Sequence, residues 1–369
     1  MTFSPLRPQA RRSFLLSLAA ATLLAGCATR PTGVQQLGAP QVNRVAVLVP
    51  LTGEDGTVGR SVADAARLAL FDTGNKGIEL SIYDTEEGGA AAAAGRAIAE
   101  GNRLILGPLL AEQVRAVAPV AQRARVPVIA YSNDVSAAAN GVFILGIAPG
   151  QAVERVVGQA HQSGARRFAA LVPNNDYGQR AAQAMFAAAQ RLGGQVAGVE
   201  SYASPEQARA AARRLSGRTF DAVLIADTGR VAQQVAPAVR TGPRILGTEL
   251  WAASSNLGQS ARLRGSWYAA PTDSRWNQFV QRYQARYGRQ PMRIATLGYD
   301  SVLLTVRAAR NWPAGRRFPE AVLREAEGFA GVDGIFRFER SNVAQRAFEV
   351  RAVTQRGTTV VSPAPTSFN

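Results

Sequence analysis

Apolar and polar residues follow one another along this chain in blocks whose period changes between strand-like and helix-like. Residues 45–49 form a continuous apolar run that ends at Pro50, which is typical of a strand buried on both faces. Apolar positions at helical spacing follow from Val62 to Leu70. The same alternation predicts further strands at 78–83, 104–106 and 128–130, and helices at 90–99 and 112–123.

The alternation starts again after residue 150. It predicts helices at 152–162, 180–192, 205–215 and 231–239, each leading to a strand, at 168–172, 196–202, 222–226 and 244–246. Strand and helix in alternation build a parallel sheet with helices on both faces. Two successive series therefore predict an α/β fold class with two Rossmann-like parallel-sheet lobes.

The last third of the chain has a different pattern. It predicts two long helices with no strand between them, at 276–287 and 294–310, and then two strands at 334–338 and 348–353. Segments of this kind suit a chain that passes back to complete earlier lobes, which makes a multi-strand hinge with a cleft between the lobes. We expect a first lobe of residues 43–147 plus 270–342 and a second lobe of residues 148–269 plus 343–362.

The N-terminal segment has the pattern of an export signal. Arginines at the start precede an apolar run at 14–24 that is too short to span a bilayer. The run ends in Leu24-Ala25-Gly26-Cys27, which resembles the lipobox of bacterial lipoproteins, where the cysteine becomes the lipidated first residue. We expect a signal peptide over residues 1–26 and a flexible tether over 27–42, and the alternative is an ordinary secretory peptide or a short anchor helix.

The signal also bears on location. Residues 11–15 resemble a twin-arginine signal, so the export route stays open between that pathway and the general one. Residue 28 is Ala rather than Asp, so retention at the inner membrane is not indicated. The expected location is the cell envelope, lipid-anchored in the inner leaflet of the outer membrane and facing the periplasm.

The formal net charge of +16 comes almost entirely from arginine, since Lys76 is the only lysine. The arginines are scattered and no aromatic stripe runs between them, so nucleic acid is not an expected partner. Two explanations of the charge stay open: a genome rich in G and C, or attraction to anionic lipid headgroups or cell-wall polymer. No later apolar stretch approaches the roughly 20 residues of a membrane-spanning helix.

The sequence offers little catalytic chemistry. His161 is the only histidine and Cys27 the only cysteine, so the usual zinc sites and His-based triads cannot be assembled. The glycine-rich segment 53–59 lacks the spacing of a dinucleotide-binding loop, and Glu54 and Asp55 would repel a pyrophosphate. We therefore expect a protein that is not an enzyme, with no catalytic residues, no cofactor and no metal.

Six short segments stand in the order of a known family, at 47–53, 105–109, 126–129, 175–178, 297–300 and 329–334. Through them the chain resembles the Leu/Ile/Val-binding family of periplasmic binding proteins over residues 43–355. The resemblance implies the type I periplasmic binding protein fold, in which two lobes enclose a ligand cleft.

The resemblance also implies a set of cleft residues at the ends of strands and the starts of helices. Carried over by motif, the candidates are Ala111, Asn133, Asp134, Tyr177 and Glu249, and Trp251 is a further candidate near the cleft edge. Tyr177 would stack on a ligand or, alternatively, pack on its own lobe. Glu249 would pair with an ammonium group or, alternatively, be a solvated loop acid. Core or hinge packing is the alternative for Trp251.

Ala111 departs from the family pattern. Amino-acid binders usually offer a Ser or Thr hydroxyl there, at a helix N-terminus that receives the ligand carboxylate. Ala111 lacks that hydroxyl, whose hydrogen bond to a charged group is worth about 1.5–3 kcal/mol. Glu112 and Asp134 add negative charge beside it. We therefore do not expect tight capture of a free α-amino acid.

The penicillin-binding-protein activator lipoproteins are a subgroup of this family that the chain also resembles, through residues 249–251 and its short arginine loops. This resemblance implies regulation of peptidoglycan synthesis by contact with a penicillin-binding protein. Such activators can carry an extra helical N-terminal domain that this sequence does not show, so we expect partner contact to differ. The alternative is a solute-binding receptor of an amino-acid ABC transporter, with a permease as its partner.

Overall fold

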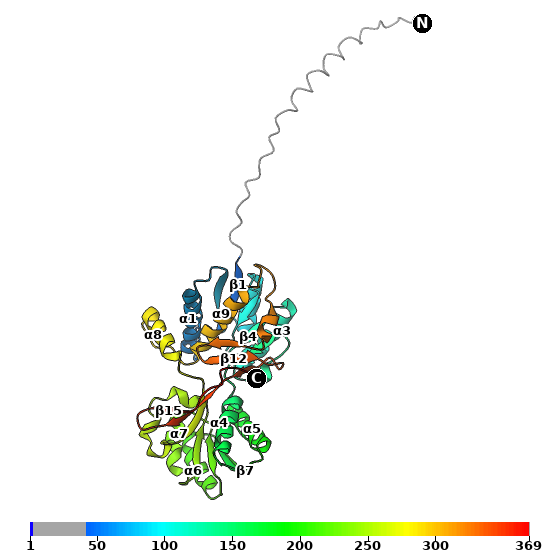
Figure 1. The fold of residues 1–369 in the computed structure, drawn as a ribbon. Coiled ribbons are helices and arrows are strands. Elements are labelled where there is room, and N and C mark those ends of the chain that lie inside the picture. Colours follow the sequence, from blue (N-terminus) through cyan, green and yellow to red (C-terminus); the bar gives the residue numbers. More distant parts are fainter. Residues whose placement is uncertain (3–41, 369) are drawn as a thin grey trace. The chain divides into compact units, whose positions relative to one another are not determined.

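The computed structural model describes residues 1–2 and 42–368 of the chain. The predicted signal peptide beyond its first two residues, Cys27 and nearly all of the predicted tether lie outside the described residues. Val42–Asn369 forms one compact unit, and this unit contains two lobes built on separate parallel sheets (Figure 1). In the described part of the chain, no helix is both long and apolar enough to cross a bilayer.

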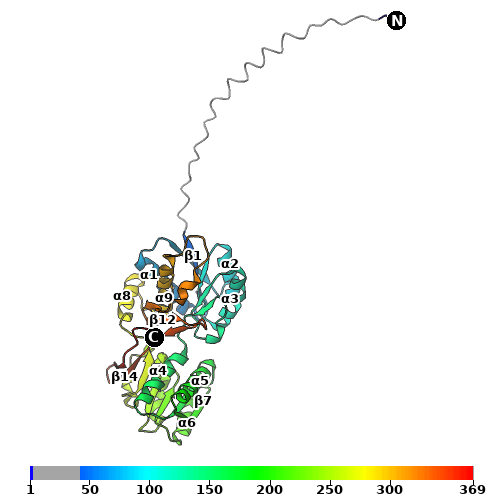
Figure 2. The same cartoon turned by 45° about the vertical axis from the view of Figure 1, so that its right-hand side comes forward.

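The first sheet has five parallel strands in the order β2-β1-β3-β4-β5. They are β1 (Asn43–Val49), β2 (Ile78–Asp84), β3 (Leu104–Leu106), β4 (Val128–Ala130) and β5 (Val142–Ile144). The helices over it are α1 (Gly56–Thr73), α2 (Ala90–Ala99), α3 (Ala111–Ala124) and α9 (Ala295–Ala309). Val45 and Val47 share a core with α1 and α9, whereas Ala46 and Leu48 share a core with α2 and α3. The two pairs of helices lie on opposite sides of the sheet (Figure 2). Burial on both faces explains the unbroken apolar run in β1.

The second sheet has seven strands in the order β15-β14-β10-β9-β8-β6-β7. They are β6 (Arg167–Pro173), β7 (Gln195–Tyr202), β8 (Ala222–Ile225), β9 (Arg244–Gly247), β10 (Trp267–Ala270), β14 (Glu349–Val353) and β15 (Thr358–Ser362). The first five are parallel, and β14 and β15 join antiparallel at one edge. One face carries α4 (Pro149–Gln162) and α5 (Asp176–Arg191), and the other carries α6 (Pro205–Ser216) and α7 (Gly229–Val235).

A small antiparallel sheet and one further helix complete the first lobe. The sheet contains β11 (Phe329–Gly331), β12 (Gly334–Phe338) and β13 (Ala344–Arg346), and the helix is α8 (Trp276–Tyr287). Their aromatic residues share the core of α1 and α9. The described chain therefore crosses between the lobes three times: after β5, after β10, and between β13 and β14.

The predicted fold class is confirmed, with two helix-covered parallel sheets joined by several crossing segments. The predicted strands at 104–106 and 128–130 have the observed bounds. The predicted helix at 231–239 is too long, because α7 ends at Val235 and a short 3-10 turn with Pro237 follows it. The predicted lobe boundaries stay a prediction.

The apolar pattern missed five strands: β5, β10, β11, β13 and β15. Three of them, β5, β11 and β13, are only three residues long, which is too short for a period of two to be visible. β15 lies at the sheet edge with most of its side chains exposed, so no buried face marks it in the sequence.

A run of alternating charges connects the segments that cross between the lobes. Arg351 in β14 donates to Glu349 at 2.6 Å and forms a second ion pair with Asp273, in the crossing after β10. Asp273 also pairs with Arg293 at 3.1 Å, and Arg293 pairs with Asp333 at 2.7 Å. We call these five residues the hinge charge chain. It reaches from the second sheet to the loop between β11 and β12.

Burial makes the hinge charge chain sensitive to the loss of one member. Arg351 is 4% exposed, Glu349 8% and Asp333 0%. Nearby, burial and the charge of Asp333 raise the pKa of Asp300 in α9 to about 7. Removing one partner of a buried ion pair leaves an uncompensated charge, which is more costly than removing the pair.

Replacing Arg351 by Met should therefore lower the free energy of unfolding by about 3 kcal/mol, since buried Glu349 loses its partner. Urea denaturation followed by circular dichroism measures this. Arg340→Met is the matched control, because Arg340 is exposed. Equal stability of the Arg351→Met variant and the wild type would contradict the structural role of this arginine.

Candidate functional site

The two lobes meet at the carboxyl ends of their parallel strands. Asp134 follows β4 in the first lobe, and Arg180 lies in the second turn of α5 in the second lobe. Their side chains form an ion pair of 3.0 Å across the lobes. Arg115 of α3 pairs with the same carboxylate, and Ser136 donates to it from its backbone N–H and its hydroxyl. These contacts place Asp134 at the junction of the lobes.

Asp134 is committed to partners within the chain. It is 2% exposed. Burial acts to raise its pKa, but the hydrogen bonds from Ser136 and Arg115 and the charge of Arg180 hold the pKa below the usual value. The carboxylate is therefore charged and neutralised internally, so it adds less negative charge to the cleft than its sequence position indicates.

A second predicted residue, Asn133, is exposed beside this ion pair. It lines a cavity of about 360 Å³ together with Arg180 and residues at the start of α4, such as Gln151. Because Asn133 comes from the first lobe and the others from the second, this cavity lies between the lobes. We call it the inter-lobe cavity.

The edge of the first sheet beside Ala111 is acidic. Ala111 is the first residue of α3, and the preceding Leu110 supplies no side-chain cap. A cavity of about 380 Å³ beside this helix start is lined by four carboxylates, from Glu54, Asp55, Glu86 and Glu112. None of the four forms an ion pair among the residues that the structure describes. We call this the acidic cavity.

Two unpartnered polar atoms add to the character of the acidic cavity: a hydroxyl, which can donate or accept, and an amide oxygen, which accepts. Thr85 and Gln113 line it, and Thr85 Oγ1 and Gln113 Oε1 are buried with no hydrogen-bond partner in the described part of the chain. Gln113 donates its amide N–H to Glu86 at 3.0 Å, which turns its amide oxygen to another side. A ligand carboxylate would meet negative charge here, whereas an ammonium group would meet acceptors.

The edge of the second sheet carries a tyrosine and a carboxyl group in contact. The Tyr177 hydroxyl, at the start of α5, donates to Glu249 Oε1 at 2.9 Å and lies 2.8 Å from Thr248 Oγ1. Burial raises the pKa of Glu249 to about 7, although the Tyr177 hydrogen bond acts in the opposite direction. The other carboxyl oxygen, Oε2, is buried and has no partner among the described residues. Glu249 can therefore accept a cationic group or hold a proton.

Three residues at the site were not identified from the sequence. Tyr202 ends β7 and donates to Asp227, just after β8, at 2.7 Å. Asp227 also lies close enough to Tyr177 to contribute to the raised pKa of that phenol, which is caused first by burial. Both residues lie at the carboxyl ends of strands, Tyr202 as the last residue of β7 and Asp227 just after β8. That position is the feature of the sequence by which they could have been identified. The third, Arg180, had no such signal, because its partner is on the other lobe.

The structure places Trp251 in the core of the second lobe. Its side chain is 0% exposed and packs against Tyr268 with ring centroids 6.0 Å apart. A Cβ atom on Gly247 would come within 2.2 Å of the indole, so glycine is required at the end of β9. Trp251 therefore supports the backbone that leads into Glu249 and presents no surface to a ligand in this conformation.

The site candidates therefore fall into separate groups. Asn133 and Asp134 lie at the junction of the lobes, Ala111 borders the acidic cavity, and Tyr177 and Glu249 are in contact on the second lobe. Cys27 lies outside the described residues. No group of three or more His, Cys, Asp or Glu side chains suited to a metal ion occurs among residues 42–368.

Two helix-covered parallel sheets with facing carboxyl edges define a two-lobe α/β binding protein. The chain matches the family model described as "Periplasmic binding protein" over residues 43–357, and it belongs to that family. The resemblance inferred from the sequence is thereby confirmed. Membership indicates a location in the cell envelope.

Curated relatives match part of the chain. An uncharacterized protein of Rickettsia prowazekii is 29% identical over 145 residues, which cover 38% of each chain. The penicillin-binding protein activator LpoA of Photobacterium profundum is 27% identical over 195 residues, 51% of this chain and 31% of that protein. The match thus spans well under two thirds of the length of either relative.

Solved structures share the fold over nearly the whole described unit. A putative branched-chain amino acid ABC transporter protein from Rhodospirillum rubrum has a TM-score of 0.75 at 20% identity, covering 87% of this chain and 100% of that chain. The C-domain of LpoA from Haemophilus influenzae, titled a regulator of PBP1A, has a TM-score of 0.68 at 19% identity, covering 86% and 100%. Identities this low establish the fold alone.

The raised pKa of Glu249 gives a pH-dependent contribution to stability. A carboxyl group whose pKa is raised by folding binds its proton more tightly in the folded state, so it stabilises the fold at low pH. This contribution should fall by about 3 kcal/mol as the pH rises from about 4.5 to about 7. Glu249→Gln should lack that part of the pH dependence, as measured by urea denaturation at several pH values.

Tyr177→Phe is the informative companion variant. It removes the hydrogen bond that lowers the Glu249 pKa, so the loss of stability should shift to higher pH than in the wild type. An unchanged pH profile in Glu249→Gln would show that Glu249 is not the buried group described above.

Proposed function

We propose that this chain is a non-catalytic, lipid-anchored protein of the cell envelope that regulates a peptidoglycan synthase of the penicillin-binding protein class. Two curated relatives are named penicillin-binding protein activators, at 27% and 28% identity. The solved C-domain of one such activator shares the fold. Those names support the proposal, and the geometry of the lobe edges supports it independently.

The acidic cavity is the observation that carries the proposal. At the start of α3, Ala111 offers no hydroxyl, and four carboxylates without ion-pair partners among the described residues line the cavity beside this helix start. A free amino acid would have to place its carboxylate in this negative environment. This favours a role that does not depend on amino-acid capture.

The cross-lobe ion pair is a second support. In a transport receptor the lobes close around a ligand, which supplies contacts to both sides. Here Arg180 and Asp134 already connect the lobes at 3.0 Å, with Arg115 on the same carboxylate. Such a connection suits a protein that presents a fixed two-lobe surface to a partner.

The lipid anchor is part of the proposal and rests on the sequence. Cys27 at the end of the lipobox-like segment would carry the acyl chains, and Ala28 favours the inner leaflet of the outer membrane. Such an anchor would hold the two-lobe unit in the periplasm, within reach of a synthase anchored in the inner membrane.

Binding to a purified bifunctional penicillin-binding protein tests the proposal. We expect the full-length chain to bind with a Kd of about 1 μM or tighter and to raise the rate of glycan polymerisation or crosslinking. Arg180→Ala should weaken the complex because it frees the second lobe from Asp134. Arg123→Ala, which removes an exposed arginine of α3, is the matched control. Absence of binding at about 100 μM would overturn the regulator function.

A receptor for a solute importer is the second candidate, and Glu249 favours it. The buried carboxyl group has an unpartnered oxygen, and Tyr177 orients it at the edge of the second sheet. Together with the acidic cavity, this edge suits a ligand with cationic groups and no carboxylate, such as a diamine. An importer permease would then be the partner.

A thermal-shift panel separates the two candidates. Amino acids should give little stabilisation, whereas a true ligand at about 100 times its Kd adds about 2.7 kcal/mol. The double variant Ala111→Ser, Glu112→Ser should raise amino-acid affinity about tenfold, since it restores a hydroxyl and removes a repelling charge. Ala116→Ser on the exposed side of α3 is the control. Unchanged affinity in the double variant would contradict the role given to the acidic cavity.

A further inference from the structure

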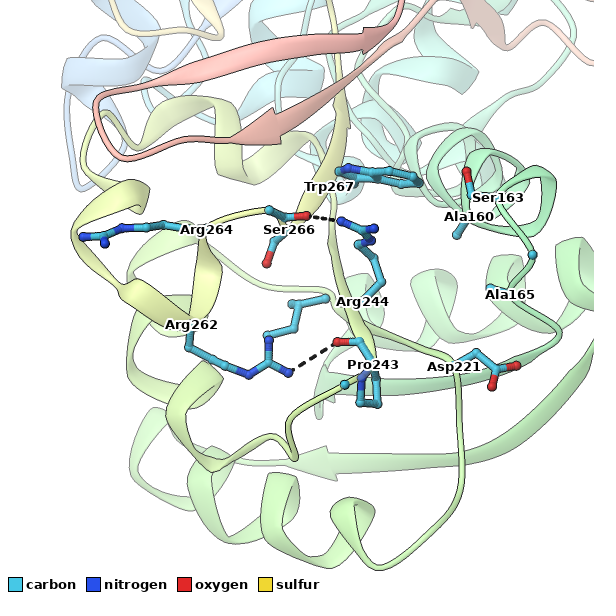
Figure 3. A pocket seen from close by; sticks show the side chains of 14 residues that line it. Ala160, Ser163, Ala165, Asp221, Pro243, Arg244, Arg262, Arg264, Ser266 and Trp267 are labelled. Carbon is cyan, nitrogen blue, oxygen red and sulfur yellow. Dashed lines mark hydrogen bonds between the residues drawn. The ribbon is translucent and has the colours of Figure 1, made fainter.

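A third cavity lies at the opposite end of the second sheet from Tyr177 and Glu249. It has a volume of about 510 Å³ and is lined where β9 and β10 begin, at Arg244 and Trp267 (Figure 3). The turn after α4 and the loop before β10 complete its wall. Because Glu249 follows the carboxyl end of β9 and Arg244 starts the strand, the cavity lies away from the cleft.

Three arginines give this cavity its charge: Arg244, Arg262 and Arg264. Each of them donates to a backbone carbonyl oxygen. Arg244 donates to Gly265 at 2.6 Å, Arg262 to Arg240 at 2.7 Å, and Arg264 to Gly258 at 2.9 Å. None of the three forms an ion pair with a carboxylate in the described part of the chain. We call this the arginine cavity.

Asp221 is the one acidic side chain among the described residues that line the arginine cavity, and it is already committed. It accepts hydrogen bonds from the backbone N–H groups of Arg166 and Arg167, at 2.9 and 2.8 Å. The Arg167 guanidinium pairs with it at 3.1 Å. Asp221 therefore does not neutralise the three lining arginines, and the cavity keeps an excess of positive charge.

The Arg244 guanidinium is held in a defined orientation. Its central carbon lies 4.2 Å from the centroid of the Trp267 ring, and one terminal nitrogen donates to Gly265 (Figure 3). The remaining N–H groups of Arg244 have no acceptor among the described residues. A planar guanidinium fixed in this way presents two parallel donors, the geometry that binds phosphate and carboxylate oxygens most strongly.

We propose that the arginine cavity is a binding site for a phosphate-bearing anion, held by Arg244 and flanked by the Trp267 ring, whereas the Arg264 side chain points away from both (Figure 3). The excess of positive charge suits a group with more than one negative charge, so a phosphomonoester or a pyrophosphate fits better than a single carboxylate. The volume is that of a small-molecule site. The phosphate comes either from a soluble molecule or from a lipid headgroup, since the chemistry recognised is the same. This proposal is independent of the function proposed above, because it uses the other end of the sheet.

Calorimetric titration of the full-length chain with inorganic pyrophosphate, and in parallel with inorganic phosphate, tests the site. We expect saturable binding, tighter for pyrophosphate. Arg244→Gln should weaken it about tenfold or more, because it removes hydrogen bonds to a charged group. Arg244→Lys keeps the charge but loses the paired donors, so its affinity for pyrophosphate should lie between that of the wild type and that of Arg244→Gln. Arg123→Gln on the first lobe removes the same charge and should bind as the wild type does.

Hydrogen exchange of the wild-type chain provides a readout that does not depend on any variant folding. Pyrophosphate should slow exchange in peptides that cover residues 242–245 and 262–267. Vesicles of phosphatidylglycerol, compared with phosphatidylcholine, separate the two sources of phosphate. Binding to the anionic vesicles that pyrophosphate competes away identifies a headgroup, and pyrophosphate binding without vesicle binding identifies a soluble ligand. No saturable binding of either kind, or binding that Arg244→Gln leaves intact, would overturn the proposal.

Discussion

The hinge charge chain is the constraint on which the two-lobe arrangement depends. Each sheet is complete within its own lobe, so no backbone ladder runs from one lobe to the other. What fixes the crossing segments is the alternation of Arg351, Asp273, Arg293 and Asp333, together with Arg346, which donates to the carbonyl of Leu145. In this alternation, Arg351 and Asp333 are buried, and removing the partner of a buried charge leaves that charge uncompensated. The pairing of these charged residues therefore favours one path of the chain between the lobes over other paths.

The two ends of the second sheet differ in chemistry, and this difference follows from the direction of its parallel strands. Carboxyl ends gather residues that follow each strand, here Tyr202, Asp227 and Glu249. Amino ends gather the residues that precede or begin each strand, here the arginines of the arginine cavity. Many guanidinium groups bind backbone carbonyl oxygens at loop ends, a role that needs no acidic partner.

Sequence periodicity predicted the central strands and most helices because those elements bury one or both faces. It could not predict β5 or β13, which are too short to show a period and depend on pairing partners distant in sequence.

The residues of the candidate site also fall into those that the sequence could indicate and those that it could not. Tyr177 and Glu249 follow strand or helix boundaries, so their neighbourhood was accessible from sequence. The pairing of Asp134 with Arg180 depends on side chains that reach from one lobe to the other, and no local pattern encodes it. Trp251 was placed near the cleft by its position in the chain, but its burial depends on the glycine at 247.

The carboxyl group of Glu249 has one further consequence for any occupant of the cleft. A neutral carboxyl that meets an arriving cation becomes charged, and its proton passes to the solvent. Occupancy of the cleft would then be coupled to proton release, and the apparent heat of association would vary with the ionisation enthalpy of the buffer. Burial raises the pKa of Glu249 to about 7, so this proton release falls within the pH range that an envelope protein experiences. The affinity of the cleft for a cationic ligand would then depend on the pH of the surrounding medium.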